Sequence, residues 1–366
     1  MINLRFFPSK QLAFYTVRLF VTRSLAVLVA LVLVLMTLDL LGESSKILAV
    51  PGNGEAQLWH YVALRLPLLI SRFLPFAVLL GTLIAFTGLN QHSEVVAMKA
   101  AGISAHQMLA PLILASLVIG GGLFFFNERV VVNANRQITA WSDNDYKPVP
   151  PESGILSNVW LLQGDDLIQA KMVGGHGSSF HVDGLTIYDR GTNGVLERIV
   201  RADRATPENG EWKLTGVKVY DSTMSMIRKV PDMQALAGLQ PEQLTLAKVD
   251  PDQLDFWTLK ERISQLELAG RPADEAKAGL WHKITGPLST LLMPLLAAIA
   301  AFGLARSGQV LLRACIGMAL GFAYFVADNF SIAMGNVGAY PPFLAAWAPF
   351  LLFLLVGETV LFRSEE

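Results

Sequence analysis

The stretch RFLPFAVLLGTLIAFTGLNQHSEVVAMKAAGIS, residues 72–104, joins a long apolar run to a short polar segment. At about 1.5 Å per helical residue, residues 73–89 cross most of the hydrocarbon core of a bilayer. The run therefore predicts a transmembrane helix, and the polar segment after it must lie on one side of the membrane.

The polar segment QHSEVVAMKAAGIS, residues 91–104, predicts a helix of about two turns with a cap at each end. Ser93 suits the N-cap, and Glu94 places a negative charge on the first turn, where the helix dipole favours it. Gly102 lies where a left-handed C-cap residue is expected. So short a helix is marginal in water alone. The pattern leaves open whether it packs on its own bundle or on a separate partner.

The composition indicates a membrane protein. Of 366 residues, 52% are hydrophobic and only 16% are charged, whereas about a quarter are charged in an average soluble domain. The net charge of −1 gives no indication of nucleic-acid binding. The single cysteine, Cys315, excludes an intramolecular disulfide and any multi-cysteine metal site. It lies in an apolar run, where we expect it to be a packing residue.

Six apolar runs predict six transmembrane helices, and all of them obey the positive-inside rule. The runs are residues 14–41, 66–89, 108–126, 280–304, 310–332 and 343–362. Basic residues near the start of the first run place the N-terminus in the cytoplasm. The first run is longer than the apolar region of a signal peptide, so we expect it to be retained. Residues 91–104 then lie on the cytoplasmic side.

Between the third and fourth runs the pattern changes to short alternating strands. Residues 127–141 predict a polar continuation of the third helix, and 255–268 return to helical period. Strand turns are expected at Gly164-Asp165, Asp183-Gly184, Asn193-Gly194 and Asn209-Gly210, with a possible bulge near Gly216. Such strands suggest an antiparallel sandwich or jelly roll. Its position after an outward span makes it extracytoplasmic.

The predicted fold class is a polytopic α-helical membrane protein, three spans plus three, with an inserted extracytoplasmic antiparallel β jelly-roll domain. The expected domains are residues 1–126, which carry the short cytoplasmic helix at about 93–101, then 127–279, and then 280–366.

The familiar motifs of catalysis are absent from the sequence. No Walker A motif is possible because the chain contains no Gly-Lys pair, and neither HExxH nor GxSxG occurs. His176 and His181 flank a Gly-rich stretch, but a hairpin loop is favoured over a metal site because no third ligand is nearby. We predict no catalytic residue, metal or resident cofactor.

Several cations gather at the predicted outer boundary of the membrane, against the usual charge bias. They are Lys46, Arg65, Arg72, Arg129, Arg136 and Lys283. Any one of these side chains alone is best explained as an anchor that extends from the apolar core to the interface. Several of them together suggest an anionic binding partner, and a phosphate group matches the geometry of arginine. The candidate lipid-binding residues are Lys46, Arg65, Arg72, Arg136 and Lys283.

Two acids and a glycine pair are candidates for a gate or a subunit seam. Asp39 and Asp328 lie near the outer ends of apolar runs. Each could make a polar contact in a substrate path or a subunit seam, or it could be a helix-end residue whose side chain reaches the membrane interface. Gly317 and Gly321 form a GxxxG motif, for which packing within the bundle is favoured over a dimer seam.

Three stretches together resemble the permease subunits of the lipopolysaccharide-transport ABC exporter, the LptF/LptG family. They are residues 72–104, Trp281-His282-Lys283-Ile284 followed by Pro287-Leu288, and YFVADNFSIAMGNVGAYPPFLAAWAP at 324–349. The resemblance covers essentially the whole chain, and the last stretch is more similar to the G subunit than to the F subunit.

The resemblance implies a non-catalytic subunit in the inner membrane of a Gram-negative bacterium. A paralogous permease, a dimeric cytoplasmic ATPase that binds ATP and Mg, and a single-span jelly-roll partner would complete the exporter. The machine would extract lipopolysaccharide from the inner membrane and pass it to a periplasmic bridge toward the outer membrane. The first and fifth spans would form lateral gates with the partner permease, and the interior of the jelly roll would receive acyl chains.

The resemblance also assigns the short polar helix as the coupling helix, which docks in a groove of the ATPase. Glu94 would pair with a basic residue there, and Val95, Val96 and Met98 would fill the groove, with Gly102 closing the helix.

One departure from the family concerns the outer end of the first span. G subunits carry several lysines there, whereas this chain has Asp39 and Glu43 with only Lys46. Arg65, Arg72 and Arg136 are the candidates to substitute. Alternatives to a G permease are the paralogous F subunit, a membrane enzyme that modifies envelope lipids, and an anchored sensor.

Overall fold

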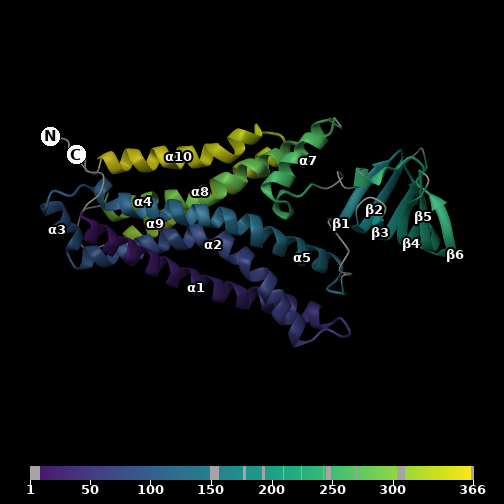
Figure 1. Cartoon of the computed structure of the whole chain (residues 1–366), viewed down its shortest axis with the longest axis horizontal. Helices are drawn as coiled ribbons and strands as arrows, with labels where there is room; N and C mark the ends of the chain where they lie inside the picture. The colour runs from purple at the N-terminus through teal and green to yellow at the C-terminus, as the bar shows by residue number, and fades with distance from the viewer. Residues whose placement is uncertain are drawn as a thin grey trace.

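The computed structural model is a helical bundle with a β-sheet at one end (Figure 1). It describes residues 9–148, 156–175, 179–191, 194–208, 210–223, 225–241, 243–244, 249–268, 270–302 and 310–363, without the side chains of 300–302 and 310–314. The start of α1, the end of α10 and the short helix α3 lie at the opposite end from the sheet. We call these the sheet end and the α3 end of the bundle.

The helices follow the predicted apolar runs but extend beyond them. Before the sheet come α1 (Lys10–Leu48), α2 (Glu55–Gln91), α3 (Glu94–Ala100), α4 (Ala105–Phe126), the π-helix η1 (Asn127–Val131) and α5 (Val132–Asp143). After it come the 3-10 turn η3 (Pro251–Gln253), α7 (Phe256–Leu268), α8 (Asp274–Phe302), α9 (Val310–Asn336) and α10 (Pro342–Arg363). The predicted outer loop at 41–60 is mostly helical, and only residues 49–54 separate α1 from α2.

Five helices of the described chain are long and apolar enough to cross a membrane, compared with the six predicted. They are Lys10–Leu48, Glu55–Gln91, Ala105–Asp143, Cys315–Asn336 and Pro342–Arg363. The remaining predicted span is α8, whose side chains are described only as far as residue 299. It packs against α2, α4, α9 and α10, and its side chains from Leu292 to Ala298 are largely buried.

Small residues allow the helices to approach closely. A Cβ atom at Gly81 of α2 would lie 2.5 Å from the Cα of Ser24 in α1. At Gly120 of α4 it would lie 2.8 Å from the carbonyl oxygen of Pro287 in α8. Both distances are far inside van der Waals contact, so only glycine fits these crossings, as is common in membrane bundles.

The sheet contains six antiparallel strands in sequence order. The strands are β1 (Leu156–Gln163), β2 (Asp166–Gly174), β3 (His181–Arg190), β4 (Leu196–Glu208), β5 (Glu211–Asp221) and β6 (Met226–Ala235). Each strand pairs with the next, so the described strands form a meander without the crossover connections of the predicted jelly roll. Short turns between consecutive strands produce this order.

One face of the sheet carries the apolar core of the domain. Trp212, Leu214 and Val217 are fully buried there, and Leu239 and Leu244 pack over them. The indole N–H of Trp212 donates to the carbonyl of Leu239 at 2.8 Å, which satisfies the one polar atom of the ring.

The predicted turns are only partly confirmed. Gly164 and Gly210 adopt positive φ between strands, and so does Gly194; Asn193 and Asn209 lie outside the described residues. The Asp183-Gly184 turn was wrong, because Gly184 lies within β3 with φ +71°. Gly216 has φ +68°, but the register of β5 with β4 and β6 is the same on both sides of it, so the expected bulge is not there; the register shift of β5 lies between Val219 and Tyr220.

The glycine at the α1–α2 crossing gives a direct test of the packing. We expect Gly81→Ala to lower the stability of the chain by about 1–3 kcal/mol, because the added methyl group overpacks the contact with Ser24. Gly88→Ala in the same helix is the matched control, since nothing lies within 4 Å of its Cβ position. Thermal unfolding in detergent should separate the two variants, and equal midpoints would contradict this packing.

Candidate functional site: polar clusters at the sheet end

The predicted polar residues gather into two clusters at the sheet end of the bundle. One lies between α1 and α2, and the other joins η1, α7, α8 and α9. A charge near the apolar core of a membrane is costly unless it is paired, so the partners of each charge decide what these clusters can do.

Asp39 of α1 and Arg65 of α2 form the centre of the first cluster. The guanidinium donates from Nε to Oδ2 and from Nη2 to Oδ1, each at 2.9 Å, in a two-point contact. Tyr61, one helical turn before Arg65, donates its hydroxyl to Oδ2 of Asp39 at 2.6 Å. Asp39 is therefore neutralised within the chain, and it holds α2 against α1.

A second acid of α1 extends this cluster toward the sheet. Glu43 accepts from Lys46 at 2.8 Å and from the hydroxyl of Tyr146 at 2.8 Å. Tyr146 follows α5, and burial, together with the hydrogen bond to Glu43, raises its pKa to about 12. Its hydroxyl remains a donor at physiological pH, and it connects the outer end of α1 to the segment that leads into the sheet.

The second cluster centres on Glu128 in the π-helix η1. Its Oε1 accepts from Lys283 of α8 at 3.1 Å, and both side chains are nearly buried, at 13% and 12% exposed. Its Oε2 accepts from the backbone N–H of Phe256, the first residue of α7. One carboxylate thus joins η1, α7 and α8.

His282 and Asp328 form the other contact of this cluster. The imidazole Nε2 lies 3.0 Å from Oδ2 of Asp328, whose side chain is 12% exposed. Asp328 therefore makes a contact between α8 and α9 inside this chain, and its role at a gate or subunit seam stays a prediction.

The remaining predicted cations differ in their availability. Arg136 of α5 donates twice to the carbonyl of Gln253, at 3.3 and 3.0 Å, and so fixes α5 to η3. Arg72 of α2 and Arg129 of η1 are exposed, and within the described residues neither side chain forms an ion pair.

The five predicted lipid-binding cations therefore do not form one open site. Lys46, Arg65 and Lys283 are each held by a carboxylate, and Arg136 is held by a carbonyl group. Arg65 and Lys283 join helices, Arg136 joins α5 to η3, and Lys46 pairs with Glu43 within α1. Arg72 alone of the five is exposed and without an ion pair among the described residues, and Arg129 of η1 resembles it in both respects.

The glycine pair lies where the favoured interpretation placed it. A Cβ atom at Gly321 would come 2.1 Å from Cδ2 of Leu79, so α9 packs closely on α2 of the same chain. Gly317 is buried one turn earlier in the same helix. Cys315, two residues before Gly317, was expected to be a packing residue. That prediction was wrong, because Cys315 is exposed.

At the α3 end of the bundle, only one of the two predicted caps of α3 is confirmed. Gly102 adopts φ +81°, and the N–H of Ile103 donates to the carbonyl of Met98, which completes the C-cap. Ser93 occupies the N-cap position with φ 59°, but its side chain makes no capping hydrogen bond. Glu94 instead accepts from the hydroxyl of Tyr15 in α1 at 3.2 Å.

The side chains of α3 divide between the core and the surface. Val95 and Met98 are 4% and 8% exposed and belong to the core of this bundle, whereas Val96 is 65% exposed. Residues three apart share one face of a helix, and here that face turns Val95 and Met98 toward the bundle. These two side chains therefore do not face outward, whereas filling a groove on a partner would require them to do so. The helix packs on its own bundle through Val95 and Met98, and docking on a partner stays a prediction for the face that carries Val96.

The histidine pair gives no metal site in the described chain. His176 lies outside the described residues, and His181 contacts the carbonyl of Ser179 at 2.9 Å and Asp183 at 3.6 Å. Among the residues that the structure describes, no group of three or more His, Cys, Asp or Glu side chains could hold a metal ion.

The sequence analysis missed Tyr61, Glu128 and Tyr146. Tyr61 is four residues before Arg65, so helical spacing alone places the two on one face. Glu128 and Tyr146 contact partners that are distant in sequence, and only the tertiary structure reveals their roles.

Comparison with known proteins identifies the family. The model of the family "Lipopolysaccharide export system permease LptF/LptG" matches residues 14–363. The chain belongs to the LptF/LptG family. It is a permease of the lipopolysaccharide export system, a multi-pass, non-catalytic transmembrane component of an ABC exporter.

Two relatives in this family match over most of their length, and both are named lipopolysaccharide export system permease protein LptG. The protein from Escherichia coli strain K12 is 27% identical over 318 residues, which cover 83% of this chain and 85% of the relative. The protein from Haemophilus influenzae strain Rd is 27% identical over 332 residues, which cover 86% and 89%. The resemblance found from the sequence is confirmed, including its greater similarity to LptG.

The Asp39–Arg65 pair can be tested by a double-mutant cycle. We expect a coupling of about 1–3 kcal/mol between Asp39→Ala and Arg65→Ala, because a two-point charged contact is strong but about a third of the arginine side chain is exposed to solvent. Unfolding in detergent is the measurement. A cycle on the more exposed Lys46–Glu43 pair should give less than about 1 kcal/mol, and equal couplings would contradict the difference between the two pairs.

Proposed function

We propose that the chain is the G-type permease subunit, which works with a paralogous permease, a dimeric cytoplasmic ATPase and a single-span partner. Two relatives that match over most of their length carry the name LptG, and residues 324–349 resemble that subunit. ATP and Mg are bound by the ATPase, and this chain, which lacks a Walker A motif, supplies the path for lipopolysaccharide.

The position of α3 is the observation that carries this proposal. It lies at the far end of the bundle from the sheet, so a partner on its side of the membrane can reach it (Figure 1). Val95 and Met98 fix the helix in the core, and Val96 presents an apolar contact to the outside. A motor that displaces α3 therefore displaces the core of the bundle with it.

Glu94 occupies the edge between these two faces. Its carboxylate accepts a hydrogen bond from Tyr15 and remains partly exposed, so it can also meet a basic group of the ATPase. Tyr15 belongs to α1, the helix that we propose to form a lateral gate with the partner permease.

The lipid phosphates are contacted by Arg72 in this proposal, with Arg129 as a second candidate. Both are exposed and unpaired by any carboxylate of the described chain, whereas Arg65 and Lys283 are engaged in helix contacts. Arginine binds phosphate at two points, which suits the anionic head of lipopolysaccharide.

Charge reversal of Glu94 tests the coupling role. We expect Glu94→Lys to reduce lipopolysaccharide export by the assembled transporter at least tenfold while ATP hydrolysis continues, because the charge contact with the ATPase is replaced by repulsion. Export and hydrolysis are measured in the same proteoliposomes. Tyr15→Phe is the matched control, since it removes the hydrogen bond to Glu94 without changing charge. Normal export by Glu94→Lys would contradict the proposed contact between Glu94 and the ATPase. An equal loss of export in Tyr15→Phe would contradict it as well.

Replacement of Arg72 tests the lipid contact. We expect Arg72→Ala to lower photocrosslinking of lipopolysaccharide to the membrane region of the complex about fivefold or more. Lys260→Ala on α7 is a control, because it removes an exposed cation on the same side of the membrane outside the proposed contact. Crosslinking at the wild-type level in Arg72→Ala would exclude this arginine as the phosphate contact.

A further inference from the structure

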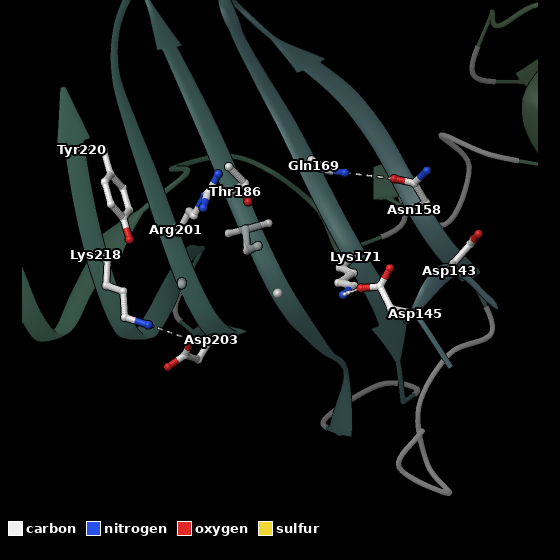
Figure 2. A pocket seen from close by; sticks show the side chains of 13 residues that line it. Asp143, Asp145, Asn158, Gln169, Lys171, Thr186, Arg201, Asp203, Lys218 and Tyr220 are labelled. Carbon is white, nitrogen blue, oxygen red and sulfur yellow. Dashed lines mark hydrogen bonds and ion pairs between the residues drawn. The ribbon is translucent and has the colours of Figure 1, made fainter. Parts of the chain in front are cut away.

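The face of the sheet opposite its apolar core carries a polar pocket of about 490 Å³ (Figure 2). The pocket is lined mainly by charged and hydrogen-bonding side chains, which come from β1 to β5 and from the end of α5. Asn158, Gln169, Lys171, Thr186, Arg201, Asp203, Lys218 and Tyr220 point into it from the strands, and Asp143 and Asp145 lie at its rim.

A single row of paired residues crosses all six strands at this pocket. In order from β1 to β6 it reads Trp160, Gln169, Thr186, Arg201, Lys218 and Lys229. Residues that pair directly across antiparallel strands share a face, with their Cβ atoms about 4.5–5.5 Å apart. The row therefore presents an aromatic ring, an amide and a hydroxyl at one side, and three adjacent cations at the other.

Three like charges in register are unfavourable in a sheet, and the chain compensates them only weakly. Lys218 lies 3.9 Å from Asp203, whose side chain is 75% exposed. Arg201 lies over the ring of Tyr220 at 5.4 Å, and in the described part of the chain no carboxylate forms an ion pair with Arg201 or Lys229. This contrasts with the bundle, where most of the cations at the sheet end are held by acceptors.

Two glycines inside strands shape the pocket. Gly184 of β3 has φ +71°, and a Cβ atom there would lie 3.0 Å from the Cβ of Lys171. Gly216 of β5 has φ +68°, and a Cβ atom there would lie 2.3 Å from Oδ2 of Asp203. Glycine weakens a strand and often marks the place where a ligand approaches it closely. Here the two glycines make room for one cation and one acid of the pocket.

We propose that this face of the sheet binds a phosphorylated saccharide. Sugar hydroxyls both donate and accept hydrogen bonds, and Asn158, Gln169, Thr186 and the aspartates supply both kinds of partner. The half-buried ring of Tyr220 and the exposed ring of Trp160 offer flat apolar surfaces to a sugar ring. Arg201 and Lys218, with Lys229 beside them, supply the charge for a phosphate group.

The inference rests on the proposed function, because the glycan of lipopolysaccharide is the saccharide that such a permease meets. It assigns the two faces of the sheet different tasks: the apolar face is filled by the chain's own core, and the polar face contacts the sugar portion of the cargo. The contact would guide the glycan while the lipid is moved through the bundle.

The test uses the full chain in detergent and a lipid-free phosphorylated oligosaccharide prepared from lipopolysaccharide. Titration calorimetry should show binding that weakens at least tenfold in the double variant Arg201→Gln, Lys218→Gln, and at least threefold in Lys229→Gln. The same oligosaccharide after removal of its phosphates should bind the wild-type chain at least tenfold more weakly. Lys213→Gln is the matched control, because it removes a lysine from the same strand outside the pocket, and it should bind within twofold of wild type.

Unchanged binding by the double variant and by Lys229→Gln would overturn the site, as would equal weakening by Lys213→Gln or tight binding of the phosphate-free oligosaccharide. The substituted side chains are on the surface of the sheet, so circular dichroism should show normal folding. Loss of this site with export intact in the assembled transporter leaves the proposed function standing. Failure of the wild-type chain to support export would instead overturn the proposed function.

Discussion

The cost of placing charge beside a membrane organises the sheet end of this protein. Three acids of the helices there are each matched by a donor from another helix: Asp39 by Arg65, Glu128 by Lys283, and Asp328 by His282. An unpaired ion at that depth would cost several kcal/mol, so these contacts determine which helices can be neighbours. The same contacts leave few cations for a ligand, which concentrates the free positive charge at Arg72, at Arg129 and on the polar face of the sheet.

The apolar runs and the short capped segment were sufficient to predict the bundle and the position of α3 at the end opposite the sheet (Figure 1). Both follow from local properties, namely run length, the distribution of basic residues and the glycine at position 102. The sixth predicted span, α8, packs against α2, α4, α9 and α10 in the described bundle. The sheet was predicted but not its order, since a run of short alternating strands fits a meander as well as a sandwich or a jelly roll.

The site was harder to predict than the fold for a related reason. Sequence identifies Arg65 and Lys283 as cations near a membrane boundary, but their partners are 26 and 155 residues away. A cation that binds a lipid and a cation that joins two helices have the same sequence signature. The division of α3 illustrates the same limit, because the list of apolar residues was correct and only the structure separates Val96 from its buried neighbours Val95 and Met98.

The unbroken helix formed by α4, η1 and α5 has a mechanical consequence. Its 39 residues, from Ala105 to Asp143, begin beside α3 and end at the sheet, where Asp143 accepts from Ser157 of β1. At about 1.5 Å per residue this is a rod of roughly 58 Å. A tilt of about five degrees at one end displaces the other by roughly 5 Å over that length. The rod therefore acts as a lever arm, which converts a small movement on one side of the membrane into a repositioning of the whole sheet on the other.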